Sequence, residues 1–122
     1  MVREGGQPDR PVIVVLSSAG AAAEREVLAG IEEEGVPYSV LPAEADATAQ
    51  DLARAAALRS PLRVGVGVGS RGDIWVHHDM LTEPLPELGC SSAGGAAART
   101  LGHNAARMVV GLPLKPDSGF RQ

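Results

Sequence analysis

Aromatic side chains are almost absent from this 122-residue chain, since Tyr38, Trp75 and Phe120 make up only 2% of it. A hydrophobic core must therefore be built from Val, Leu, Ile and Ala, and an aromatic platform for stacking nucleic-acid bases is implausible. The formal net charge is −4, and no block of basic residues occurs. Together these features argue against nucleic acid and against an anionic membrane as the main partner.

The chain is also poor in cysteine and in long apolar runs. Cys90 is the only cysteine, so no disulfide can form within the chain, which fits a cytoplasmic protein. The first ten residues, MVREGGQPDR, lack the apolar core of a signal peptide, and no apolar run approaches the ~18 residues that span a bilayer. We expect one domain over 11–113, flanked by tails at 1–10 and 114–122.

The apolar pattern predicts a mixed α/β fold. The run PVIVVL at 11–16 is typical of a strand that is buried on both faces. The other predicted strands are 38–41, 62–68 and 73–78. Apolar residues at helical spacing predict helices at 21–34, about 48–58 and 97–110. The order β-α-β-α-β-β-α implies a small, partly parallel sheet of about four strands with helices packed against it. The Pro- and Gly-rich segment 79–96 is expected to be a loop.

Three glycines alternate with valines in VGVGVG at 64–69. They lie within a strand and not between a strand and a helix, so a phosphate-binding loop is not indicated. A bare strand face favours close approach of another backbone or side chain, and we count it among the candidate parts of a partner interface. A three-residue turn with Gly72 in the left-handed conformation would pair Gly67 with Trp75, whose ring would cover the glycine.

Glu32, Glu33 and Glu34 form an acidic turn at the end of the helix predicted over 21–34, just before Gly35. A helix C-terminus carries partial negative charge, so anions there are destabilising. The acidic turn is either a solvated helix end or a carboxylate group offered to a cation or a basic partner. Magnesium would suit it, because this ion commonly takes only one or two protein carboxylates. Further ligands would have to come from another chain, since no second acidic motif of this density occurs.

The remaining candidates are weaker. Arg99, His103 and Arg107 recur at four-residue spacing and form a cationic stripe on the last predicted helix, which is either a solvated face or a docking face for another subunit. His77 and Asp79 share one face of a strand, but two ligands are too few for a zinc site. The sequence contains no recognisable catalytic triad or acid/base pair, so we do not expect an enzyme.

Two stretches of the chain resemble the small subunit of the reactivating factors for adenosylcobalamin-dependent diol and glycerol dehydratases. They are REVLAGIEEEGVPY at 25–38 and GHNAARMVVGLP at 102–113, with SPLRVG at 60–65 between them. The resemblance implies the α/β fold of the dehydratase medium subunit. It also implies a partner, a large subunit that binds and hydrolyses ATP, so that ATP or ADP would not be bound by this chain.

The resemblance further implies a chaperone-like role. Nucleotide-driven exchange between the small subunit and the dehydratase's own medium subunit would release damaged cobalamin, and dehydratase subunits would be transient partners. A magnesium ion at the interface with the large subunit would take one glutamate from the small subunit. That residue matches Glu33, or Glu32 or Glu34 if the helix phase differs. The resemblance and the stripe together place the following residues at the partner interface: Glu32, Glu34, Arg99, His103 and Arg107.

Two other functions stay open at this point. The chain could be the medium subunit of a dehydratase itself, or a stand-alone homo-oligomeric module that binds a small anion near residues 17–20. We also expect that the isolated chain can self-associate through the surface that serves its partner.

Overall fold

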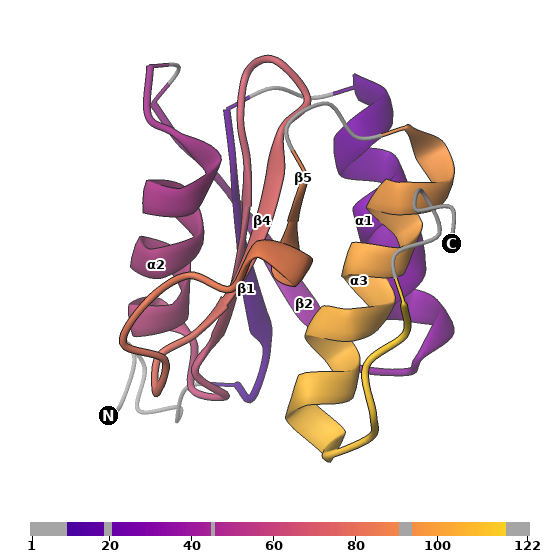
Figure 1. Ribbon diagram of the computed structural model, residues 1–122. Helices are drawn as coiled ribbons and strands as arrows, with labels where there is room; N and C mark the ends of the chain where they lie inside the picture. The colour runs from indigo at the N-terminus through magenta and orange to yellow at the C-terminus, as the bar shows by residue number, and fades with distance from the viewer. Residues whose placement is uncertain (1–9, 19–20, 45, 91–93, 117–122) are drawn as a thin grey trace.

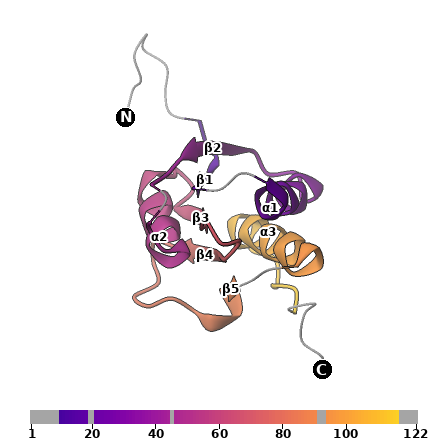
Figure 2. The ribbon, with the colours of Figure 1, turned by 90° about the horizontal axis from the view of Figure 1, so that it is seen from above.

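The protein is a three-layer α/β sandwich. The computed structural model describes residues 10–18, 21–44, 46–90 and 94–116. A five-stranded sheet in the order β2-β1-β3-β4-β5 has α2 on one face and α1 and α3 on the other (Figures 1 and 2). The elements are β1 Ile13–Ser17, α1 Ala21–Glu33, β2 Tyr38–Pro42, α2 Ala49–Arg59, β3 Val64–Val68, β4 Ile74–His78, the 3₁₀ turn η1 Pro86–Leu88, β5 Gly89–Cys90 and α3 Gly95–Val110. The predicted α/β class is confirmed.

The sheet is mixed, as the element order implied. Strand β1 pairs in parallel with both β2 and β3, whereas β3–β4 and β4–β5 are antiparallel. The expectation of about four strands was one strand short, because β5 lies inside the segment predicted as a loop. A strand of two residues is too short to show an alternating pattern. The fully buried Leu88, at the end of η1, anchors this segment to the core.

The strand pairing and the turn of the predicted hairpin are confirmed. Gly67 pairs with Trp75, and the turn uses Gly72 at φ 86°, a left-handed conformation that glycine adopts without strain. Two details were wrong. A side chain at Gly89 of β5 would collide with the Trp75 ring, so the ring covers that glycine and not Gly67. The bare glycine face is not a partner surface either, because α2 fills it: a Cβ on Gly67 would lie 2.6 Å from the backbone nitrogen of Ala53.

The core is aliphatic on both sides of the sheet. Between the sheet and the α1/α3 layer, the core includes Ile13, Val15, Val27 and Ile31, all fully buried. The opposite face holds a smaller cluster of Val14, Leu16, Leu52 and Ala56 under α2. Thr48 caps α2, its hydroxyl accepting the backbone N–H of Asp51 at 3.1 Å. No helix in the described ranges has the length and apolarity needed to cross a bilayer.

Helices α1 and α3 lie unusually close because glycines face each other where they meet. A Cβ on Gly30 would lie 2.9 Å from the backbone nitrogen of His103, and a Cβ on Gly102 would collide with the carbonyl oxygen of Val27. Backbone-to-backbone packing of this kind is possible only without side chains at the contact. The close approach brings the end of α1 within reach of side chains on α3.

The two expected tails are only partly described. Of residues 1–10, only Arg10 lies within the described ranges, and of 114–122 only residues 114–116 do. Lys115 is tied to α3, since the buried amide of Asn104 accepts its backbone N–H at 2.7 Å and donates to its carbonyl oxygen at 3.0 Å. The chain beyond α3 therefore returns along that helix.

Candidate functional site

The acidic turn and the cationic stripe, which the sequence placed about seventy positions apart, meet in one cluster on the α1/α3 face. Glu33 contacts Arg99 and His103, and Glu34 contacts Arg107. Closer to the start of α1, the Glu26 carboxylate accepts a hydrogen bond from Nε of Arg99 at 3.0 Å. The contacts advance in the same order along both helices, so α1 and α3 run in the same direction. Each sequence candidate thus has an intramolecular partner that spacing alone did not indicate.

Glu33 is the most fully engaged member of the acidic turn. Its Oε1 lies 2.6 Å from Nε2 of His103, and its Oε2 accepts a hydrogen bond from Arg99 at 3.1 Å. The Glu33 side chain is nevertheless 49% exposed. The hydrogen bond with His103 is the main cause that holds the pKa of Glu33 below the ordinary value of 4.5, with the charges of Arg99 and Lys115 helping and partial desolvation opposing. Glu33 is therefore an ionised carboxylate on an accessible surface.

Lys115 determines which ring nitrogen of His103 carries the proton that faces Glu33. The Lys115 ammonium group lies 2.8 Å from Nδ1 of His103, and an ammonium group can only donate. Nδ1 must therefore accept, which assigns the proton of the ring to Nε2 and directs it at Glu33. The sequence analysis missed both Lys115 and Asn104, which holds the Lys115 backbone in place.

The two flanking glutamates are held differently. Glu34, whose side chain is 15% exposed, accepts from Nε of Arg107 at 3.0 Å, and the same guanidinium donates to the carbonyl oxygen of Pro113. Glu32 accepts a 2.6 Å hydrogen bond from the hydroxyl of Tyr38. That hydrogen bond, together with burial, raises the pKa of Tyr38 above its usual value of 10.0. Of the three carboxylates, Glu33 combines the greatest number of cationic neighbours with an open side.

The unfavourable place of three anions at a helix end now has an explanation. The last turn of α1 contains no basic residue of its own. Gly35, at φ 80°, ends the helix in the left-handed conformation that is common at helix C-termini. The compensating charges come from α3 and from Lys115, so the acidic turn depends on the packing of α1 against α3.

The donor chemistry of Glu33 fits a hard cation as one ligand among several. Each carboxylate oxygen has two lone-pair directions, so a hydrogen bond to each oxygen leaves capacity on the exposed side. Magnesium accepts oxygen ligands and commonly takes only one or two carboxylates from a protein. Among the described residues, no group of three or more His, Cys, Asp or Glu side chains is arranged to hold a metal ion.

The other sequence candidates form no comparable cluster. His77 is buried, and burial is the main cause that lowers its pKa below 6.5. Of the suggested anion site near 17–20, Ser17 is buried and the hydroxyl of Ser18 donates to the carbonyl oxygen of Val68. Residues 19 and 20 of that suggestion lie outside the described residues.

The fold and this cluster correspond to one family of known proteins. The family model described as dehydratase medium subunit matches residues 10–115, and the chain belongs to that family. The chain is similar to small subunits of dehydratase-reactivating factors, which confirms the resemblance seen in the sequence. It is 36% identical over 107 residues to the propanediol dehydratase-reactivating factor small subunit of Citrobacter freundii, covering 86% of this chain and 90% of that protein.

Further relatives agree. The chain is 39% identical over 92 residues to the diol dehydratase-reactivating factor small subunit of Klebsiella michiganensis, covering 75% of this chain and 72% of that one. Among solved structures, a glycerol dehydratase reactivase matches with a TM-score of 0.80 and 32% identity, covering 89% and 100% of the two chains. A diol dehydratase-reactivating factor complexed with ADP and Mg²⁺ matches with a TM-score of 0.75 and 34% identity, covering 88% and 99%.

The hydrogen bond between Glu33 and His103 should make stability depend on pH. Because the folded-state pKa of Glu33 lies below about 4.5, its contribution is fully present above that value and is lost as the pH falls through the folded-state pKa. We expect the stability difference between wild type and Glu33→Gln to shrink between pH 6 and pH 3. Urea unfolding at a series of pH values measures it.

The His103→Ala variant, which lacks the main cause of the pKa shift, serves as the control for this pH dependence. In that background the Glu33→Gln difference should vary much less with pH. A wild-type difference that stays constant from pH 6 to pH 3 would show that the hydrogen bond is not formed in solution.

Proposed function

We propose that this chain is the small subunit of a dehydratase-reactivating factor and that it acts beside a large subunit which binds and hydrolyses ATP. By exchanging places with the medium subunit of an inactivated diol or glycerol dehydratase, the pair would release damaged cobalamin. The chain itself is not catalytic in this proposal and works in the cytoplasm. Support comes from relatives that are reactivating-factor small subunits and from the related structure complexed with ADP and Mg²⁺.

The observation that carries the proposal is the exposed, ionised carboxylate of Glu33. We assign Glu33 as the single ligand that this chain contributes to a magnesium ion whose other ligands belong to the large subunit. The bound ion would supply a positive charge that joins carboxylates of the two proteins. The hydrogen bonds from Arg99 and His103 orient the carboxylate, and the His103 hydrogen bond together with the charge of Arg99 holds it ionised. Glu32 and Glu34 fit less well, since Glu32 accepts the hydroxyl of Tyr38 and the Glu34 side chain, paired with Arg107, is only 15% exposed.

The test is the affinity of the full chain for its cognate large subunit, measured by calorimetry with ADP and with or without Mg²⁺. Wild type should bind more tightly with Mg²⁺. Glu33→Gln keeps the size of the side chain but removes its charge, and should lose about 10- to 100-fold in affinity, the range for one charge-assisted contact. Its remaining binding should no longer respond to Mg²⁺. Glu32→Gln, the same change one residue earlier, is the matched control and should retain the Mg²⁺ response.

Two results would contradict the assignment. One is a Glu33→Gln variant that binds as tightly as wild type and responds equally to Mg²⁺. The other is a Glu32→Gln variant that loses the Mg²⁺ response while Glu33→Gln keeps it, since the ligand would then be Glu32.

The alternative function, the medium subunit of a dehydratase, has its own test. Mixing the chain with the large and small subunits of a dehydratase should restore coenzyme binding only if the chain is that medium subunit. We expect no restoration, because the chain spans 99–100% of the reactivase chains it matches.

A further inference from the structure

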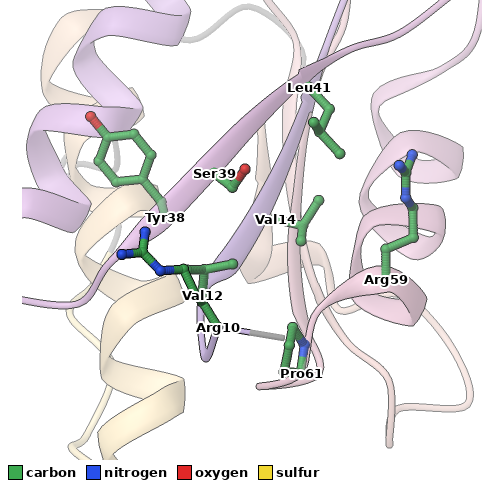
Figure 3. Close-up of a pocket in the computed structure, with 8 residues that line it drawn as sticks. All are labelled: Arg10, Val12, Val14, Tyr38, Ser39, Leu41, Arg59 and Pro61. Carbon is green, nitrogen blue, oxygen red and sulfur yellow. The ribbon is translucent and has the colours of Figure 1, made fainter. Parts of the chain in front are cut away.

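A groove lies on the opposite side of the sheet from the acidic turn. Helix α2 packs on β1, β3 and β4, so the α2-facing side of the edge strand β2 stays open. The resulting groove has a volume of about 420 Å³. Figure 3 shows Val12, Val14 and Leu41 along its floor, with Arg59 projecting from α2 on one side and Arg10 on the other.

The pairing of the strands explains why the floor is apolar. Val14 is in register with Ser39, and Leu16 with Leu41, and residues in register across a parallel pair point to the same face. Ser39 and Leu41 therefore extend the apolar cluster of β1 beyond the last residue that α2 covers. A half-buried hydroxyl and aliphatic side chains leave a strip that suits the side chains of an extended polypeptide.

Strand β2 also has an unpaired edge. On the edge that faces β1, the carbonyl oxygen of Pro37 accepts the backbone N–H of Ile13, and the backbone N–H of Ala43 donates to the carbonyl oxygen of Ser17. Both distances are 3.0 Å. Backbone groups alternate in direction along a strand, so those of Tyr38 and Val40 point away from β1. Pro42 lacks an N–H group and ends the row. Within the described residues, no strand pairs with this outer edge.

Two arginines give the groove a local positive charge. Arg10 and Arg59 are exposed and form no ion pair or hydrogen bond with any other described residue, whereas Arg99, Arg107 and Lys115 are all engaged. The chain as a whole carries a net charge of −4. An arginine on each side of an apolar floor complements a segment that carries carboxylates, because guanidinium groups bind them with paired hydrogen bonds.

From this charge and shape we infer that the groove receives an extended, acidic segment of the large subunit, which lies along β2 with its carboxylates between Arg10 and Arg59. This inference rests on the proposed pairing with that subunit. The large subunit is the occupant because β2 follows the acidic turn directly. Tyr38 both lines the groove and hydrogen-bonds to Glu32, so a protein that reaches Glu33 also reaches the edge of β2.

The first experiment reverses the charge of the groove in the full chain. The double variant Arg10→Glu/Arg59→Glu should bind the cognate large subunit, with ADP and Mg²⁺ present, at least about tenfold more weakly, because like charges would meet. Its binding should also become less sensitive to salt. The matched control is Arg54→Glu/Arg71→Glu, which changes the net charge equally at exposed positions outside the groove and should bind as wild type does.

This result can be separated from the metal assignment. The groove variant should keep its response to Mg²⁺, whereas Glu33→Gln should lose it. A groove variant with unchanged affinity overturns the inference and leaves the assignment of Glu33 intact. Thermal unfolding followed by circular dichroism identifies a groove variant that has failed to fold.

A second experiment does not depend on the stability of that variant. A photo-crosslinking amino acid, p-benzoylphenylalanine, replaces Ser39 inside the groove, and mass spectrometry identifies the peptide that it captures in the complex. The expected product is a segment of the large subunit that contains Asp or Glu. Capture of a second copy of this chain, or of a large-subunit segment without acidic residues, overturns the inference.

Discussion

The Gly102→Ala variant is expected to lose about 3 kcal/mol of unfolding free energy, although alanine is the better helix former. A Cβ at this position would collide with the carbonyl oxygen of Val27 and would lie 3.1 Å from the Cα of Gly30. Both obstacles are backbone atoms, so no change of rotamer can relieve the overlap. The two helices must separate, and the aliphatic core beneath them must lose contacts. Urea unfolding of the purified chain measures the effect.

The control for Gly102→Ala is the same substitution at the start of the same helix. A Cβ on Gly95 would meet only the side chain of Glu26, at an ordinary 3.8 Å. Gly95→Ala should therefore be neutral or should stabilise by about 0.5–1 kcal/mol, the usual gain from replacing a helical glycine. If both substitutions behave alike, α1 and α3 do not approach as closely as the structure shows.

Gly102→Ala should also disturb the candidate site, because helix packing alone brings Glu33 to His103. As the helices separate, the pKa of Glu33 should rise toward its ordinary value, and the Mg²⁺-dependent part of the affinity for the large subunit should fall. Titration of the Glu33 carboxyl carbon by NMR reports the first change directly. This coupling links a buried glycine contact to the proposed function of the exposed carboxylate.

The sequence predicted the elements better than their contacts. A continuous aliphatic run identified β1, and the positions of Gly35 and Gly72 predicted where a helix and a hairpin turn end, since both patterns are local. The prediction that Glu33 lies at an exposed helix end also came from local rules. The pairing of the acidic turn with the cationic stripe could not be predicted, because it depends on how two helices seventy residues apart are packed.

Some signals for that packing were nevertheless present in the sequence. Gly30 and Gly102 lie inside helices, where glycine costs about 1 kcal/mol relative to alanine, so each indicates a close contact. Asn104 lies on the apolar side of α3, and a buried amide needs hydrogen-bond partners, which the chain around Lys115 supplies. The identity of those partners was beyond local reasoning, as was the two-residue strand β5.

The Gly67→Ala variant should destabilise the protein by an amount comparable to Gly102→Ala, about 1–3 kcal/mol. A Cβ on Gly67 would collide with the carbonyl oxygen of Ala49 and would lie 2.6 Å from the backbone nitrogen of Ala53. Helix α2 rests directly on the glycines of β3, so it would have to lift away from the sheet. Trp75, the single tryptophan, is paired with Gly67 on the neighbouring strand, and its fluorescence should report the change.

This variant distinguishes the two meanings that a bare glycine face can have. If the face served a partner, Gly67→Ala would weaken binding to the large subunit and leave the isolated chain as stable as wild type. Because α2 occupies the face, we expect the isolated Gly67→Ala chain to be less stable than wild type. Gly95→Ala is again the control and should not be destabilised.

Lifting α2 also moves Arg59 away from the floor of the groove. The salt-sensitive part of the affinity should therefore fall in Gly67→Ala, while the response to Mg²⁺ through Glu33 on the other layer persists.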